Sequence, residues 1–126
     1  MKLGWDLNTG FECYLTSWKS SNDPSIGEFT YKVSITGLPQ LVISRGSTIK
    51  YRTGTWNGVR FSGLLIPDTT VLRNTYKFDK DEAYYMFGFI DSSVISLSTL
   101  NYSGLLEHFT VKNKSTEWTL LFTRPF

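Results

Sequence analysis

The fold class is decided by the stretch Gly27-Glu28-Phe29-Thr30-Tyr31-Lys32-Val33-Ser34-Ile35. Apolar residues occupy every second position of this stretch, and charged or polar residues lie between them. A period of two places the apolar side chains on one face of an extended strand, whereas a helical period would not. The stretch therefore predicts a β-strand with one face in the core and the other in solvent.

Shorter runs of the same kind follow along the chain, and turn-forming residues separate them. Their spacing is about ten residues, which is typical of an all-β sandwich, barrel or prism. The stretch 53–70 breaks the pattern with three glycines and a proline, and it predicts a long surface loop. The predicted strands after the first are residues 40–44, 48–52, 72–78, 83–90, 93–100, 105–111 and 116–122.

The composition is that of one folded domain without a bias toward nucleic acid or membrane. The chain has 126 residues, of which 40% are hydrophobic and 16% aromatic, and its formal net charge is +2. Its basic residues are scattered, so we expect no nucleic-acid partner. The apolar runs are too short for a membrane-spanning helix. Residues 1–6 lack the apolar region of a signal peptide, so this chain by itself is not expected to be secreted.

The residues that could carry catalysis are few, and no cofactor or metal is expected. His108, the single histidine, lies in an alternating run and is predicted to point outward. The acidic cluster 79–82 is interpreted as a solvated hairpin tip, because it lacks the spaced ligands of a calcium loop. Cys13, the single cysteine, is predicted to be a half-buried apolar residue without a disulfide partner. One cysteine and one histidine cannot hold a structural zinc ion. The chain is therefore not expected to be an enzyme.

Two N-glycosylation sequons are present, Asn101-Tyr102-Ser103 and Asn113-Lys114-Ser115. Both lie in predicted turns, where an acceptor asparagine is exposed. Asn101 and Asn113 are therefore predicted glycan acceptors if the chain passes through a secretory pathway.

An ordered series of short motifs runs along the whole chain. The motifs are Leu15-Thr16-Ser17-Trp18-Lys19-Ser20, Asp23-Pro24, Gly27, Phe29, Gly37-Leu38-Pro39-Gln40-Leu41, Tyr51-Arg52, Trp56-Asn57-Gly58-Val59-Arg60-Phe61-Ser62-Gly63, Ser93-Val94-Ile95-Ser96, Phe109-Thr110 and Glu117-Trp118. This series resembles that of a known family, the plant S-locus glycoproteins and S-domain (G-type lectin) receptor-like kinases. No single motif decides the resemblance, but the series in this order is specific.

The resemblance implies a bulb-lectin-like β-prism built of short antiparallel strands. Residues 1–126 would be one S-locus glycoprotein domain, the second lectin-like unit, with residues 1–20 overlapping the end of the family's bulb-lectin domain. The parent would lie outside the cell, secreted or at the plasma membrane, and this fragment would meet the membrane only through missing parts of that parent. A separate serine/threonine kinase domain, absent from this chain, would complete the receptor.

Two departures from the family pattern bear on function. Cys13 stands where relatives usually have a basic residue, and Thr55 where they usually have proline. The mannose-binding pattern of bulb lectins, Gln-x-Asp-x-Asn-x-Val-x-Tyr, aligns with residues 36–44, where only Val42 matches. Sugar hydroxyls need buried donors and acceptors, so we expect no carbohydrate binding at that position.

The resemblance implies an extracellular recognition module that binds a small secreted cysteine-rich protein or forms a receptor homodimer. Recognition of pollen in self-incompatibility and defence-type signalling both fit. The alternatives are a degenerate lectin that reads glycans or amphiphilic microbial molecules through another surface, and an inert structural spacer.

The expected contacts lie in two stretches. Residues 64–73 combine aliphatic side chains with a proline and an arginine, and correspond to the first hypervariable stretch of the self-incompatibility receptors. Residues 105–117 correspond to a later one. The candidate contact residues are Leu65, Ile66, Asp68, Arg73, Leu105 and Glu107.

Overall fold

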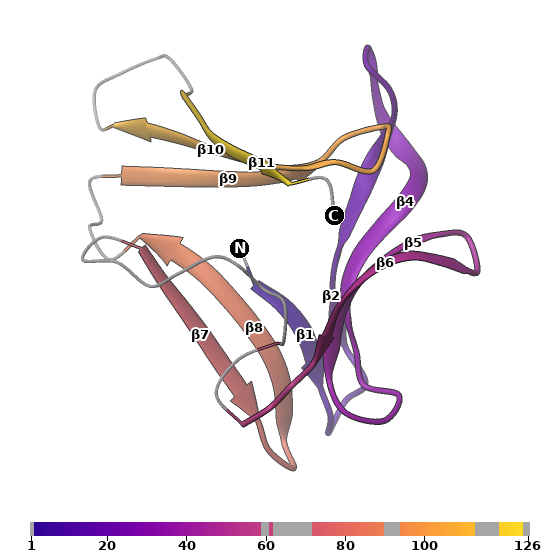
Figure 1. Ribbon diagram of the computed structural model, residues 1–126, viewed down its shortest axis with the longest axis vertical. Helices are drawn as coiled ribbons and strands as arrows, with labels where there is room; N and C mark the ends of the chain where they lie inside the picture. The colour runs from indigo at the N-terminus through magenta and orange to yellow at the C-terminus, as the bar shows by residue number, and fades with distance from the viewer. Residues whose placement is uncertain (1, 59–60, 62–71, 90–93, 113–118, 125–126) are drawn as a thin grey trace.

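The computed structural model describes residues 2–58, 61, 72–89, 94–112 and 119–124, and the described part is built of β-strands and turns without a helix (Figure 1). The all-β class predicted from the alternating sequence is therefore confirmed. The strands are β1 (Lys2–Asp6), β2 (Glu12–Cys13), β3 (Leu15–Ser20), β4 (Asp23–Ser34), β5 (Gln40–Arg45), β6 (Thr48–Thr55), β7 (Leu72–Phe78), β8 (Glu82–Phe89), β9 (Val94–Leu100), β10 (Leu106–Lys112) and β11 (Thr119–Arg124).

The strands form two sheets. One has four strands in the order β2-β1-β8-β7, and the other has seven in the order β11-β10-β9-β3-β4-β5-β6. Neighbouring strands are antiparallel, except that β3 and β9 meet in parallel at the pair Ser17–Leu100. The long sheet bends at this junction. Figure 1 shows β9–β11 across the top, β4–β6 at the right, and β1, β7 and β8 below. Three sheet faces around one interior agree with the predicted β-prism.

The core lies between these three faces and is made of side chains from both sheets. It comprises Leu3, Tyr31, Val33, Leu41, Ile43, Phe61, Tyr85, Phe87, Leu100 and Leu106. Tyr31 and Val33 come from the stretch that predicted the first strand, and they are 1% and 0% exposed. Ile35 was expected on the same face, but it is 38% exposed because β4 ends at Ser34 and the chain turns through Gly37, whose φ is +77°.

The loop predicted for residues 53–70 begins later than expected. Thr53–Thr55 belong to β6, and Trp56 forms a β-bridge with Phe61. Phe61 is fully buried, and its ring lies 5.6 Å from those of Tyr76 and Phe78. Aromatic packing thus draws this part of the chain against β7, which the glycine content of the segment did not reveal. Residues 59–60 and 62–70 of the predicted loop lie outside the described residues.

Candidate functional site

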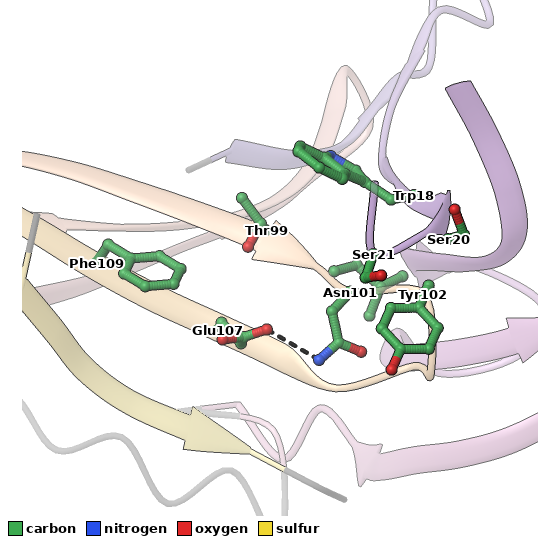
Figure 2. A pocket seen from close by; sticks show the side chains of 9 residues that line it. Trp18, Ser20, Ser21, Thr99, Asn101, Tyr102, Glu107 and Phe109 are labelled. Atoms are coloured by element: carbon green, nitrogen blue, oxygen red, sulfur yellow. Dashed lines mark hydrogen bonds between the residues drawn. The ribbon is translucent and has the colours of Figure 1, made fainter. Parts of the chain in front are cut away.

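A groove of about 380 Å³ lies where β3 meets β9 and β10 (Figure 2). The three strands are brought together by the bend in the long sheet. The register places Glu107 beside Thr99, so both side chains stand on the same outward face. We call this site the aromatic groove. Its lining consists of Trp18, Ser20, Ser21, Thr99, Leu100, Asn101, Tyr102, Glu107 and Phe109.

Aromatic rings form the apolar walls of this groove. Trp18 and Tyr102 are 44% and 52% exposed, although both are large rings of a kind usually well buried. Ile26, the cross-strand partner of Trp18 on β4, is 77% exposed. The rings therefore present apolar surface to solvent around a few polar groups, which is the composition of a small-molecule or partner site.

The polar part of the aromatic groove is centred on Asn101, which also organises the turn between β9 and β10. Its Oδ1 accepts hydrogen bonds from the Ser103 amide at 3.0 Å, the Ser103 hydroxyl at 2.8 Å and the Leu105 amide at 3.0 Å. Its Nδ2 donates to Glu107 Oε1 at 2.9 Å. The Asn101 side chain is therefore half-buried, with its Oδ1 and one Nδ2 hydrogen engaged, and not a free group on a surface turn.

Arg73 marks a second exposed surface, on the outer face of the four-stranded sheet. It lies on the edge strand β7, opposite Gly88 on β8, so the facing position has no side chain. Met86, two residues away on the same face of β8, is 38% exposed. Lys2 of β1 is paired with Met86, and its Nζ lies 4.4 Å from the centre of the Tyr84 ring. The face therefore combines exposed cations with exposed apolar surface.

His108 points into the molecule, which corrects the prediction that it points outward. It is 2% exposed, its ring lies 4.9 Å from that of Phe87, and its Nδ1 is 2.7 Å from the Ser98 hydroxyl. Because side chains alternate along β10, the outward positions are those of Glu107 and Phe109. A serine–histidine pair is the start of a nucleophilic site, but the histidine of this one is buried, and neither residue lines the aromatic groove.

The sequence model of a protein family, the S-locus glycoprotein domain, matches residues 51–126, which is more than half of the chain. The chain belongs to the S-locus glycoprotein family. It is 38% identical over 127 aligned residues to a receptor-like serine/threonine-protein kinase of Arabidopsis thaliana, and 38% identical over 127 to an S-locus-specific glycoprotein of Brassica oleracea var. alboglabra. Both alignments cover 99% of this chain, but only 15% of the kinase and 29% of the glycoprotein. The chain thus spans less than a third of either relative, and the resemblance inferred from the motifs is confirmed.

The described residues among the expected contacts, Arg73, Leu105 and Glu107, do not lie in one site. Glu107 lies in the aromatic groove and Arg73 on the outer face of the four-stranded sheet. Figure 1 shows the start of β7 at the left of the view and the start of β10 at the right, toward β4. Leu105 is half-buried and lines a separate cavity of about 170 Å³. Leu65, Ile66 and Asp68, and the second sequon at Asn113, lie outside the described residues.

The sequence reasoning missed Trp18 and Phe109 as site residues. Trp18 lies in the motif 15–20 and Phe109 in the predicted strand 105–111, and both rings face outward. Their common groove forms only when β3 meets β9. Asn101 was predicted as a glycan acceptor, but not as the residue that holds Glu107. The signal available from the sequence was an aromatic residue in each segment, which by itself names no site.

The charged and sulfur-containing groups outside the groove have local structural roles. The tip of the β7–β8 hairpin is solvated as predicted, with Lys77 Nζ 2.6 Å from Glu82 Oε2. Burial raises the pKa of Glu12, and the positive charge of Lys32 opposes this shift. Cys13 is half-buried, as expected.

Within the described ranges, no three acidic, histidine or cysteine residues lie close enough together to bind a metal ion. The same residues contain no helix with the length and apolar character needed to cross a membrane.

Proposed function

We propose that this chain is an extracellular recognition module of a plant receptor-like kinase or S-locus glycoprotein, and that it binds a small secreted cysteine-rich protein or a second receptor chain. Family membership is the observation that carries the proposal. The same segment makes up 15% of the relative named a kinase and 29% of the relative named a glycoprotein, so the kinase is about twice as long. A segment common to both therefore supplies what the two proteins share, and in a parent of the kinase type the kinase domain would lie elsewhere.

We place the parent outside the cell or at the plasma membrane, in keeping with the names of these relatives. Residues 1–126 would then be one S-locus glycoprotein domain, with residues 1–20 overlapping the preceding lectin unit. The module itself would carry no catalytic activity, because the His108 of its Ser98–His108 pair is buried. Recognition of pollen and defence-type signalling are both compatible with such a module.

The outer face of the four-stranded sheet is the surface that we propose for the protein partner. Arg73 is exposed there and belongs to the stretch 64–73 that the family resemblance marks as variable. Arginine and methionine are enriched in protein interfaces, since one donates several directed hydrogen bonds and the other adapts its shape. Arg73, Met86 and Lys2 together favour a partner with acidic and apolar groups.

A lectin function gains no support from the mannose-type position. Of the aligned residues, Leu38 is 61% exposed and Val42 is buried, and the polar sugar ligands are replaced. A structural spacer would need no exposed Arg73–Met86 surface. The distinction between spacer and recognition module therefore rests on a binding measurement.

The test combines a loop exchange with a charge reversal. Residues 64–73 are replaced with those of a relative, and Arg73→Glu is made separately; Arg52→Glu, an exposed change on β6 of the other sheet, is the matched control. Self-association of the chain is measured by sedimentation. Its binding to each protein of a panel of small secreted cysteine-rich proteins from the same plant is measured as well. We expect at least about a tenfold loss of binding for the exchange and for Arg73→Glu, as for an interface hot spot. The proposal would be overturned if both variants kept unchanged self-association and partner binding. It would also be overturned if the unmodified 126-residue chain showed no binding.

A further inference from the structure

The first sequon places its acceptor inside a groove. Figure 2 shows Asn101 among the side chains that line the aromatic groove, with its nitrogen directed toward Glu107, Tyr102 beside it and Trp18 across from it. A sugar attached to this nitrogen therefore starts next to Glu107 at the lining of the groove, whereas a sugar on a protruding turn would start in solvent.

We propose that Asn101 carries an N-linked glycan whose first sugar, an N-acetylglucosamine, occupies the aromatic groove. The groove is then a binding site for the chain's own glycan, and a protein partner uses another surface. The proposal rests on the extracellular location proposed above, because N-glycans are added in the secretory pathway. It does not depend on what the module recognises.

The attachment chemistry is a glycosyl transfer from a lipid-diphosphate-linked oligosaccharide. The bond between the anomeric carbon of the first sugar and the diphosphate oxygen breaks, and a bond from that carbon to Asn101 Nδ2 forms. The amide loses one proton, the lipid diphosphate leaves, and no group is oxidised or reduced. Because the folded Nδ2 is engaged with Glu107 and half-buried, the transfer precedes folding of this turn.

The existing hydrogen bonds are compatible with the product. A glycosylated Nδ2 keeps one hydrogen, which can still be donated to Glu107, and Oδ1 keeps its three donors from Ser103 and Leu105. The turn can therefore hold its shape with the sugar attached, and its shape fixes the direction in which the sugar leaves the asparagine.

The groove matches the chemistry of this first sugar. A volume of about 380 Å³ lies within the range of small-ligand sites, roughly 300–1,000 Å³. The rings of Trp18 and Tyr102 can cover the apolar C–H face of a pyranose and lose water in doing so. The hydroxyls of Ser20, Ser21 and Thr99 line the same groove and can pair with sugar hydroxyls.

The experiment compares the whole 126-residue chain with and without one sugar. An Asn113→Gln background leaves a single sequon. The chain is secreted with an added leader from mannosidase-inhibited plant cells and trimmed with endoglycosidase H to one N-acetylglucosamine; the same chain from bacteria carries none. Peptide mapping locates the sugar, and hydroxyl-radical footprinting with mass spectrometry measures the oxidation rate of each aromatic residue. Phe11 and Tyr14, which are 67% and 49% exposed outside the groove, are internal controls.

We expect the sugar on Asn101 and about a twofold or greater drop in the oxidation of Trp18 and Tyr102, because a seated ligand removes most of the shared surface from water. Phe11 and Tyr14 should not change. A secreted, folded chain without a sugar on Asn101 overturns the proposal, and so does a glycosylated chain whose Trp18 and Tyr102 are oxidised as fast as before.

Two secreted variants keep the comparison valid if the bacterial chain does not fold. Ser103→Ala abolishes the sequon and leaves Asn101 in place, at the cost of the Ser103 hydroxyl bond. Ser103→Thr retains both the sequon and a hydroxyl. Protection of Trp18 in the threonine variant but not in the alanine variant supports the proposal, and equal oxidation in both contradicts it. Loss of partner binding in either variant would bear on the proposed function alone.

Discussion

At the scale of a single residue, Gly27 is required because β3 and β4 approach each other closely at this position. The register between these strands shifts between Thr16 and Trp18, so that Gly27, Glu28 and Phe29 lie opposite Ser17 alone. Ser17 is buried, and its hydroxyl accepts a hydrogen bond from the Phe29 amide at 3.0 Å. The side chain thereby replaces a carbonyl of the interrupted ladder, and a residue without Cβ fits beside it.

The residue-scale prediction is that Gly27→Ala destabilises the domain by about 1–3 kcal/mol, as overpacking does in a filled interior. A Cβ at Gly27 would lie 2.2 Å from the Trp18 carbonyl oxygen and 2.6 Å from Ser17 Oγ, so the strands must move apart. The free energy of unfolding from denaturant titration measures the effect.

Gly88→Ala is the matched control, because it is also a strand glycine and its Cβ would meet nothing within 4 Å. It should change the free energy of unfolding by less than about 1 kcal/mol. Equal effects of the two substitutions would show that the close approach at Gly27 is not a constraint.

At the scale of elements, the β7–β8 hairpin is closed by an aspartate. Asp79 Oδ1 accepts hydrogen bonds from the amides of Glu82 and Asp81, both at 2.8 Å. These two bonds, with the Lys77 and Lys80 charges as smaller causes, lower the pKa of Asp79 below its ordinary value of 3.8. The carboxylate form is thus the one that the hairpin binds.

The element-scale prediction follows from the sign of this shift. A carboxyl group with a lowered pKa in the folded state contributes stability above its unfolded pKa, and loses it as the pH falls through the folded pKa. At neutral pH the wild type should therefore have a higher Tm than the Asp79→Asn variant. The difference in Tm should shrink as the pH falls below 3.8. Thermal melts at several pH values measure it.

Asp81→Asn is the control at the same hairpin tip, where the side chain accepts a hydrogen bond from Asn8 Nδ2 at 3.3 Å. Its effect should not follow the pH dependence of the Asp79 variant. A difference between wild type and Asp79→Asn that stays constant down to the lowest pH would contradict the role given to the carboxylate.

At the scale of the whole molecule, the two sheets are joined through one core. Leu3 and Tyr85 of the four-stranded sheet pack in the same cluster as Tyr31 and Leu106 of the long sheet. The indole N–H of Trp5 on β1 also donates to the Val33 carbonyl of β4 at 2.9 Å, which crosses from one sheet to the other. Neither sheet can bury its inner face without the other.

The whole-molecule prediction is a single cooperative unfolding transition. Far-ultraviolet circular dichroism reports the strands of both sheets, and tryptophan fluorescence reports Trp5, Trp18 and Trp56 in different parts of the molecule. The two signals should follow one denaturation curve, as in two-state unfolding of small domains. Separate midpoints for the two probes would show that residues 1–126 do not fold as one unit.

The sequence by itself determined the all-β class, most of the strands and the inward positions of Tyr31 and Val33, because alternation is a local property of an extended chain. Tertiary structure decided which face His108 takes, how far β6 extends, and that Trp18 meets Asn101 and Glu107 in one groove. Those outcomes depend on the register and pairing of strands that lie up to some eighty residues apart. Local periodicity leaves such pairings open, since they are set by the packing of the whole core.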